Sequence, residues 1–237
     1  IFLSIFLIFN VTLCNAQSGS LSPYSFYGVG ENTFKGSMEN RSMGGLSVYS
    51  DSISINLTNP AAYSELKLVN YSVGINYSNI NLKSENSNEK ATTASINYLS
   101  VAVPTKHFVF GFGIRPKSSV GYLLESNDDS KIPNEINRYE GNGGVNTTFL
   151  TMGFKILKKI RFGISANYDF GSLEHSNSRF LDGVELYTRV QSNSSLSGLS
   201  FDYSVLFREE ISKNLTIHAT YGIKPSSKLS SNNSQIL

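Results

Sequence analysis

The feature that most constrains the fold is a strict alternation of apolar and polar residues in the second half of the chain. It is clearest in residues 161–170, where Phe162, Ile164, Ala166, Tyr168 and Phe170 alternate with Arg161, Gly163, Ser165, Asn167 and Asp169. A period of two is that of a pleated strand, whose successive side chains point to opposite faces. The pattern predicts a β-sheet with one apolar and one polar face.

The same alternation returns in residues 199–208 and 215–223. Less regular runs cover residues 67–83, 91–103, 108–124 and 145–156. We therefore expect about seven antiparallel strands and an all-β fold.

Strand and loop lengths favour a transmembrane β-barrel over a soluble sandwich. The runs reach about ten residues or more, which suits a tilted membrane strand, whereas average strands have about five or six. Residues 157–159 and 209–214 form short connections, while residues 125–144 and 172–197 form long polar ones. Short turns at one end and long loops at the other are typical of bacterial outer-membrane barrels.

Composition and charge exclude several classes of function. The net charge is only +2, and the 20 lysines and arginines are scattered, so no phosphate-binding surface for nucleic acid is expected. Cys14 is the only cysteine. It lies in the leading apolar segment, so its removal with that segment would leave no disulfide, cysteine nucleophile or cysteine metal site.

Residues 1–16 resemble a secretory signal peptide. Residues 1–13 are largely apolar, and Cys14, Asn15 and Ala16 form a small-residue cleavage site before Gln17. Because neither a starting methionine nor a positive leading region is present, we expect that the extreme N-terminus is missing. A lipoprotein signal at Cys14 is the less favoured alternative, since Leu13 is large for the position before a lipidated cysteine.

The titratable residues show no catalytic or metal-binding pattern. His107, His175 and His218 are far apart in the sequence, and none belongs to an HExxH or GxSxG motif. We predict no enzyme activity, no metal and no cofactor. His218 falls on a polar strand face, where it is either a lumen residue or a solvated one. The adjacent Asp128 and Asp129 could bind a cation, but two carboxylates fall short of the six to eight oxygen ligands of calcium.

The segment before the first strand, residues 17–65, is rich in glycine, serine and asparagine and carries three ordered phrases. These are SFYGVG at residues 25–30, NRSMGG at residues 40–45, and NPAA at residues 59–62, with Asp51 before the last. This order resembles the opening of the FadL/TodX family of outer-membrane transport proteins. The resemblance implies a hatch that plugs the barrel, with its motif at Met43, Gly44, Gly45, Asn59, Pro60 and Ala61.

The resemblance also implies a complete fold and a function. The family fold has about fourteen strands, so residues 66–237 would be the first half of the barrel and the chain would continue beyond residue 237. The implied protein is a gram-negative outer-membrane channel, without cofactor, for passive uptake of long-chain fatty acids or similar hydrophobic molecules. A PorV-like barrel that binds exported proteins is the alternative, and an outer-membrane phospholipase or protease is a third.

The run 108–124 predicts a kink, because Pro116 interrupts its alternation and cannot donate a backbone hydrogen bond. In the FadL family a kink in the third strand opens the barrel sideways to the membrane, so the resemblance assigns Gly113, Arg115 and Pro116 to a lateral opening for the ligand. Alternatively, Pro116 ends the strand at the membrane border, since the residues after it suit a turn.

Overall fold

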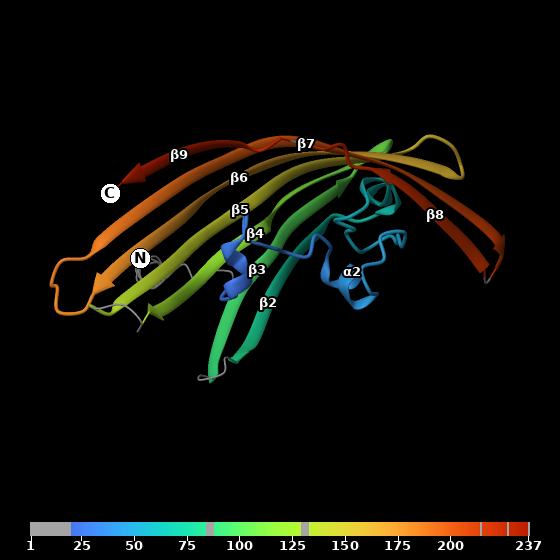
Figure 1. Ribbon diagram of the computed structural model, residues 1–237. Helices are drawn as coiled ribbons and strands as arrows, with labels where there is room; N and C mark the ends of the chain where they lie inside the picture. Colours follow the sequence, from blue (N-terminus) through green and yellow to red (C-terminus); the bar gives the residue numbers. More distant parts are fainter. Residues whose placement is uncertain (1–19, 84–87, 129–132, 214, 227, 237) are drawn as a thin grey trace, which may run out of the picture.

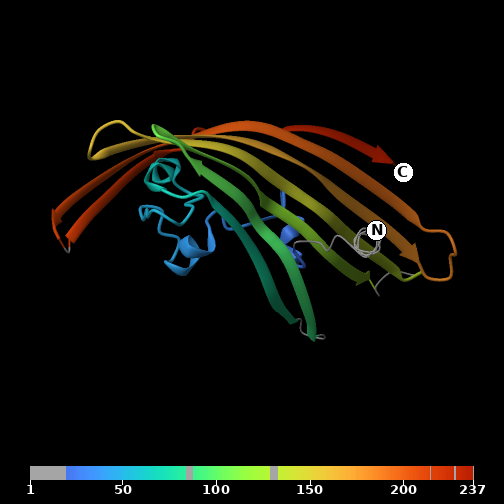
Figure 2. The same ribbon diagram turned by 180° about the vertical axis from the view of Figure 1, so that it is seen from behind.

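The computed structural model describes residues 20–83, 88–128, 133–213, 215–226 and 228–236, so the segment 1–16 lies outside the described residues. The fold is all-β. One antiparallel sheet has the strand order β2-β3-β4-β5-β6-β7-β8, with β1 paired to β4 and β9 paired to β7. The sheet curls like a trough, and the segment before β2 lies under its concave face (Figure 1), as the reverse view also shows (Figure 2).

The alternation located the strands correctly, because each of the seven predicted runs overlaps one long strand. The strands are β2 (Asn70–Lys83), β3 (Asn88–Pro104), β4 (Phe108–Asp128), β5 (Glu135–Lys155), β6 (Ile160–Leu181), β7 (Thr188–Ser212) and β8 (Leu215–Ile223), with the shorter β1 (Glu31–Asn32) and β9 (Ser230–Ile236).

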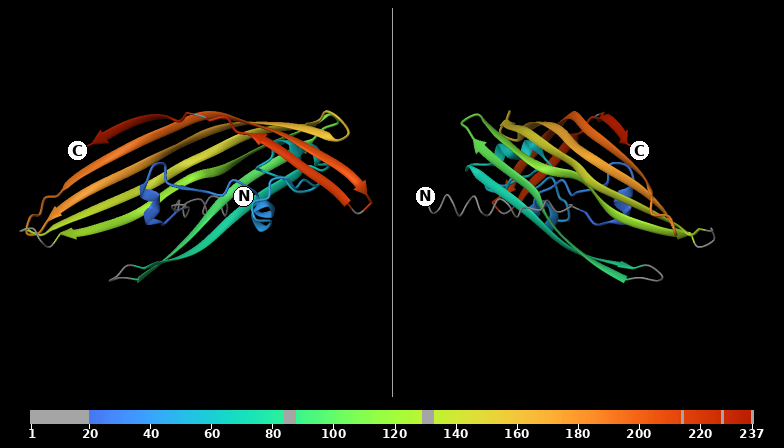
Figure 3. Two further views of the ribbon diagram at one scale, coloured as in Figure 1. Left: turned by 45° about the vertical axis from the view of Figure 1, so that its right-hand side comes forward. Right: turned by 90° about the vertical axis from the view of Figure 1, so that its left-hand side faces the viewer.

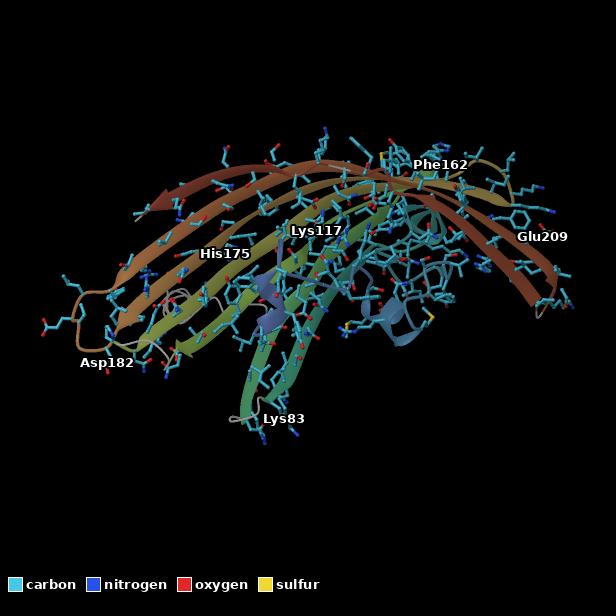
Figure 4. All side chains as sticks on the ribbon, in the orientation of Figure 1. Lys83, Lys117, Phe162, His175, Asp182 and Glu209 are labelled. Carbon is cyan, nitrogen blue, oxygen red and sulfur yellow. The ribbon has the colours of Figure 1, made fainter. Side chains whose placement is uncertain are left out.

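The prediction of two long polar loops, at residues 125–144 and 172–197, was wrong. Strands β4 to β7 continue through most of both segments, and β5 pairs with β6 without a break from Glu135 to Lys155. Strands pair through their backbone groups and need no apolar face. A strand with both faces exposed to water therefore keeps its hydrogen bonds but shows no alternation of apolar and polar side chains. Residues 182–187 and 156–159 make connections at opposite ends of the sheet. In Figure 4, Asp182 marks the first of these ends, and Glu209 of β7, which pairs with Lys159, marks the other.

The last strand position is occupied by two pieces. β8 pairs with Tyr203–Ser212 of β7, and β9 pairs with Gln191–Ser197 of the same strand. Since β6 holds the other side of β7, β8 and β9 lie in line along one edge. Residues 230–236 thus extend the sheet along this edge. Pro225, which lacks an amide donor, lies in the interruption.

The apolar face of the sheet is exposed and its polar face is covered. In residues 161–170 of β6, the buried residues are Arg161, Gly163, Ser165, Asn167 and Asp169, all on the concave face. The convex face exposes large apolar side chains, among them Phe112, Leu150, Tyr168, Leu199, Phe201, Val205 and Phe207. Figure 4 shows Phe162 on this convex side. A soluble sandwich buries its apolar faces instead, so this sheet differs from a sandwich in which of its faces is covered.

The segment before β2 contains three short helical turns. They are η2 (Pro23–Phe26), α2 (Met38–Ser42) and η3 (Pro60–Glu65), and they stay within the trough in both rotated views (Figure 3). No helix among the described residues is long and apolar enough to cross a membrane. In the described part of the chain, the outer edges of β2 and of β8 and β9 have no pairing strand.

Candidate functional site

A buried carboxylate fixes the end of η3 to the concave face. Glu65 accepts hydrogen bonds from Arg161 and, at 2.8 Å, from Arg208, and the Lys155 ammonium lies 3.9 Å away. We call these four residues the inner ion-pair cluster. Its members come from η3, β5, β6 and β7, so it joins the N-terminal segment to three strands at the short-turn end of the sheet.

The cluster changes the titration of Glu65. Burial raises the pKa of this carboxyl, but the hydrogen bond from Arg161 and the positive charges of Lys155, Arg161 and Arg208 outweigh burial, so its pKa lies below its ordinary value. A depressed carboxyl pKa means that the ionised form stabilises the folded state. This contribution is complete above pH 4.5 and is lost as the pH falls through the lowered pKa.

We therefore expect acid to release the N-terminal segment from the trough. Protease cleavage within residues 20–66 of the detergent-solubilised protein should increase as the pH is lowered from 7 to 3, measured with an acid-active protease. Glu65→Gln should remove the part of this pH dependence that Glu65 contributes. Superimposable cleavage profiles of the wild type and the variant would contradict the assignment.

A second set of ion pairs lies in the trough farther from the short-turn end of the sheet. Lys35 pairs with Asp202 of β7 at 2.5 Å, and Lys117 of β4 pairs with Asp169 of β6 at 2.5 Å. Arg115 donates to the Lys35 carbonyl at 3.2 Å. Burial, followed by the charge of Arg115, lowers the pKa of Lys35 to about 8. Lys35 therefore ties the N-terminal segment to β7 through its side chain and to β4 through its carbonyl, whereas the pair of Lys117 and Asp169 joins two strands of the sheet.

The predicted residues Asn59, Pro60 and Ala61 contact the wall directly. Asn59 caps η3 by accepting from the Ala61 amide and also donates to Thr220 of β8 at 3.0 Å, while the Ala61 amide donates to Ser204 of β7 at 2.8 Å. A Cβ on Gly163 of β6 would overlap the Pro60 and Ala61 backbones. Glycine is needed there because η3 approaches the sheet too closely for any side chain.

The other half of the predicted motif lies apart. Met43, Gly44 and Gly45 form the turn after α2, with φ angles of +70° at Gly44 and +85° at Gly45. These angles favour glycine, and among the described residues no hydrogen bond joins this turn to a strand. The structure therefore does not bring the two halves of the motif together, and a plugging role for either half stays a prediction.

The residues predicted to form a kink lie at an irregularity in β4. The register with β5 shifts between Pro116 and Ser118. Pairing of β4 with β3 ends at Ile114. Arg115 is turned into the trough, and a Cβ on Gly113 would overlap the Leu99 carbonyl and the Phe149 ring. These three positions thus mark the point at which β3 and β4 separate.

A cavity of about 660 Å³ opens at the short-turn end. Its positive side chains are Lys67, Lys155, Lys158, Lys159, Arg161 and Arg208, and its negative ones are Asp51, Glu65, Glu209 and Glu210. Six positive and four negative groups leave a surplus of +2. We call this cavity the basic mouth.

The histidines do not form a site. His218 lies in the basic mouth, with its Nδ1 3.4 Å from the Ser50 hydroxyl, and His175 contacts the Tyr122 hydroxyl at 2.8 Å. Within the described residues, no group of three or more histidine, cysteine or acidic side chains could hold a metal. The side chains at 128 and 129 lie outside the described part of the structure.

The sequence analysis missed Lys35, Glu65, Asp169 and Asp202 as a group. A signal was present, because Asp169 and Asp202 are acidic residues on the polar faces of strands whose other faces are apolar. Their partners are distant in sequence: Lys35 and Asp202 are 167 residues apart. No spacing rule predicts such a pairing.

The comparisons with known proteins decide the family. The model of the BamG family matches residues 1–237. The chain belongs to the BamG family. Its family places this BamG chain at the outer membrane of gram-negative bacteria. No curated protein and no solved structure gives a significant match.

The BamG match corrects the interpretation that rested on FadL/TodX. The family assignment was wrong, and with it the fatty-acid channel, the hydrophobic ligand and the lateral exit for that ligand; the PorV-like alternative has no support either. The physical reason lies in the motif itself. Gly44 and Gly45 make a tight turn and Asn59 caps a helical turn, so these residues report local backbone geometry that chains of different families can share.

Proposed function

We propose that this BamG chain is a membrane-embedded β-wall that works with the Bam machinery in the assembly of outer-membrane proteins. The family supports the role. The observation that carries membrane embedding is the exposed apolar convex face opposite a trough of buried ion pairs. Lipid favours an apolar outer surface, whereas a water-exposed sheet would be expected to cover it.

The proposal includes an orientation. In bacterial outer-membrane barrels, short turns face the periplasm and longer extensions face outward. The apolar band on β6 spans Phe162–Phe170, about the length that crosses a bilayer when tilted, and β6 continues to Leu181. The basic mouth then faces the periplasm, where an acidic surface of a Bam subunit can contact it through charge complementarity.

Affinity purification tests the proposal. A tagged full-length protein from gently solubilised envelopes should retain Bam subunits. Depletion of the protein should lower the folded levels of several unrelated outer-membrane proteins and leave soluble periplasmic proteins unchanged. Purification without Bam subunits, together with unchanged outer-membrane proteins after depletion, would refute the proposal.

Charge reversal tests the contact surface separately. Lys67 and Lys158 line the basic mouth, and no ion pair of either appears among the described residues. Lys67→Glu with Lys158→Glu should reduce the recovery of Bam subunits, most clearly at low salt. Lys83→Glu is the matched control and should leave recovery unchanged, because Lys83 lies at the end of β2 far from the basic mouth (Figure 4).

A further inference from the structure

A split opens between β3 and β4. The two strands pair only over Leu99–Pro104 and Val109–Ile114, although β3 begins at Asn88 and β4 runs to Asp128. Outside this paired stretch, residues 88–98 of β3 remain paired with β2, and residues 115–128 of β4 remain paired with β5. The β2–β3 hairpin therefore diverges from the rest of the sheet (Figures 1 and 3).

A short strand of the N-terminal segment already occupies the start of this split. In β1, Glu31 and Asn32 pair with Ser119 and Ser118. The next residue, Thr33, donates its amide to the Lys117 carbonyl at 3.0 Å. β1 thus takes the place beside β4 that a continuous β3 would fill, which shows that this edge accepts an antiparallel strand.

Beyond β1, the edge still offers backbone groups. In a strand, backbone groups point alternately to the two sides. Glu31 pairs with Ser119, and the Gly121 amide, two residues on, donates to the Ser25 hydroxyl at 3.1 Å. The backbone groups of Leu123 then face the same side, where β4 has no strand partner in the described part of the chain.

Both flanks of the edge carry apolar contacts. On the concave flank, Val120 and Tyr122 belong to a buried cluster with Val145, Leu173 and Leu196. On the other flank, at the start of the split where β1 pairs with Ser118 and Ser119, a groove of about 670 Å³ is lined by Ile96 of β3 and Pro116 of β4, with Tyr168 and Phe170 of β6 and several serine and asparagine side chains. An extended segment here would place alternate side chains on each flank.

The height of the split favours a peptide over an acyl chain. Pro116 pairs with Asn146, and Asn146 pairs with Phe170, the last apolar residue of the convex band on β6. The split therefore starts at the outer border of the band, where water can reach the backbone. Free amides and carbonyls at such an edge bind another main chain.

We propose that the split is a strand-docking site, at which an extended segment of an outer-membrane protein under assembly adds to the edge of β4 beside Leu123, in line with β1. This inference rests on the proposed function and names its substrate class. The docked segment alternates apolar and polar residues, as outer-membrane strands do. Main-chain hydrogen bonds hold it, and the two flanks select its side chains.

Peptide binding by the purified full-length protein in detergent tests the site. The probe is a fluorescent ten-residue peptide of alternating valine and threonine, and the readout is fluorescence anisotropy. Leu123→Pro removes an amide donor on the open side and leaves the amides of Tyr122 and Leu124, which face β5, intact. We expect about fivefold weaker binding. Leu123→Ala, the matched control, should bind within about twofold of wild type, because its amide is retained.

Three results would overturn the docking site: equal binding by Leu123→Pro, equal binding of a peptide with proline at every second position, or no binding of the probe by the wild type. Asn127→Pro, on the same side of the same edge, serves as a second variant if Leu123→Pro misfolds. Recovery of Bam subunits is measured in parallel. A protein that retains these subunits but fails the peptide test disproves only the docking site.

Discussion

Glu65→Leu is expected to lower the free energy of unfolding by about 3–5 kcal/mol, because it leaves a buried guanidinium without its carboxylate. Arg161 is 7% exposed, and after the substitution its one remaining protein acceptor among the described residues is the Lys158 carbonyl. Equilibrium denaturation of the detergent-solubilised protein measures the loss. Protease sensitivity of residues 20–66 reports whether the N-terminal segment detaches.

A control and a rescue make this prediction specific. Glu125 pairs with Arg138 between side chains that are both more than 40% exposed, so Glu125→Leu should cost about 0–1 kcal/mol. Arg161→Leu combined with Glu65→Leu should recover part of the stability, because the unpaired buried charge is removed. If Glu65→Leu is no more destabilising than Glu125→Leu, the inner ion-pair cluster does not hold the segment.

Phe201→Arg is expected to destabilise the membrane-inserted protein by about 2–4 kcal/mol, because it places a charge near the middle of the apolar band. Phe201 is 39% exposed on the convex face and pairs with Ala166 within Phe162–Phe170. The folded, membrane-extracted fraction should fall, as measured by heat-dependent mobility of the envelope fraction on gels.

Two matched variants separate membrane depth from loss of the aromatic ring. Ser195→Arg lies on the same face of β7, six residues beyond and opposite the polar Ser172, and should cost about 0–1 kcal/mol. Phe201→Leu retains an apolar side chain and should insert normally. Equal effects of Phe201→Arg and Ser195→Arg would show that the convex face does not contact lipid.

The strands could be predicted from the sequence wherever a face is apolar. Phe162–Phe170 and residues 199–208 show an uninterrupted period of two, because lipid or core on one side and polar groups on the other impose it. The extensions of β5 back to Glu135 and of β6 to Leu181 could not be predicted. Their backbones are paired, but no apolar face leaves a periodic signal.

The candidate site was only partly accessible from the sequence. Pro116 carried a recognisable strand irregularity, because a missing amide donor is a local property of the backbone. Asn59 and Pro60 were assigned to a hatch motif, and the helical turn that they begin was not predicted. Family membership could not be inferred from such local chemistry, and the resemblance to FadL/TodX pointed to the wrong family. Cap and turn residues are selected by the backbone conformation of a few neighbouring positions, whereas function depends on surfaces built from distant segments.

By itself, the sequence determined that this protein is an antiparallel β-sheet with one apolar face, because side-chain alternation is fixed by the pleat. Only the tertiary structure decided which face is covered, that Glu65 meets Arg161 and Arg208, and that β1 lies beside β4 where β3 departs. Those contacts join residues 86 to 143 positions apart. They arise because the curl of the sheet brings its strands around one segment, which no local pattern encodes.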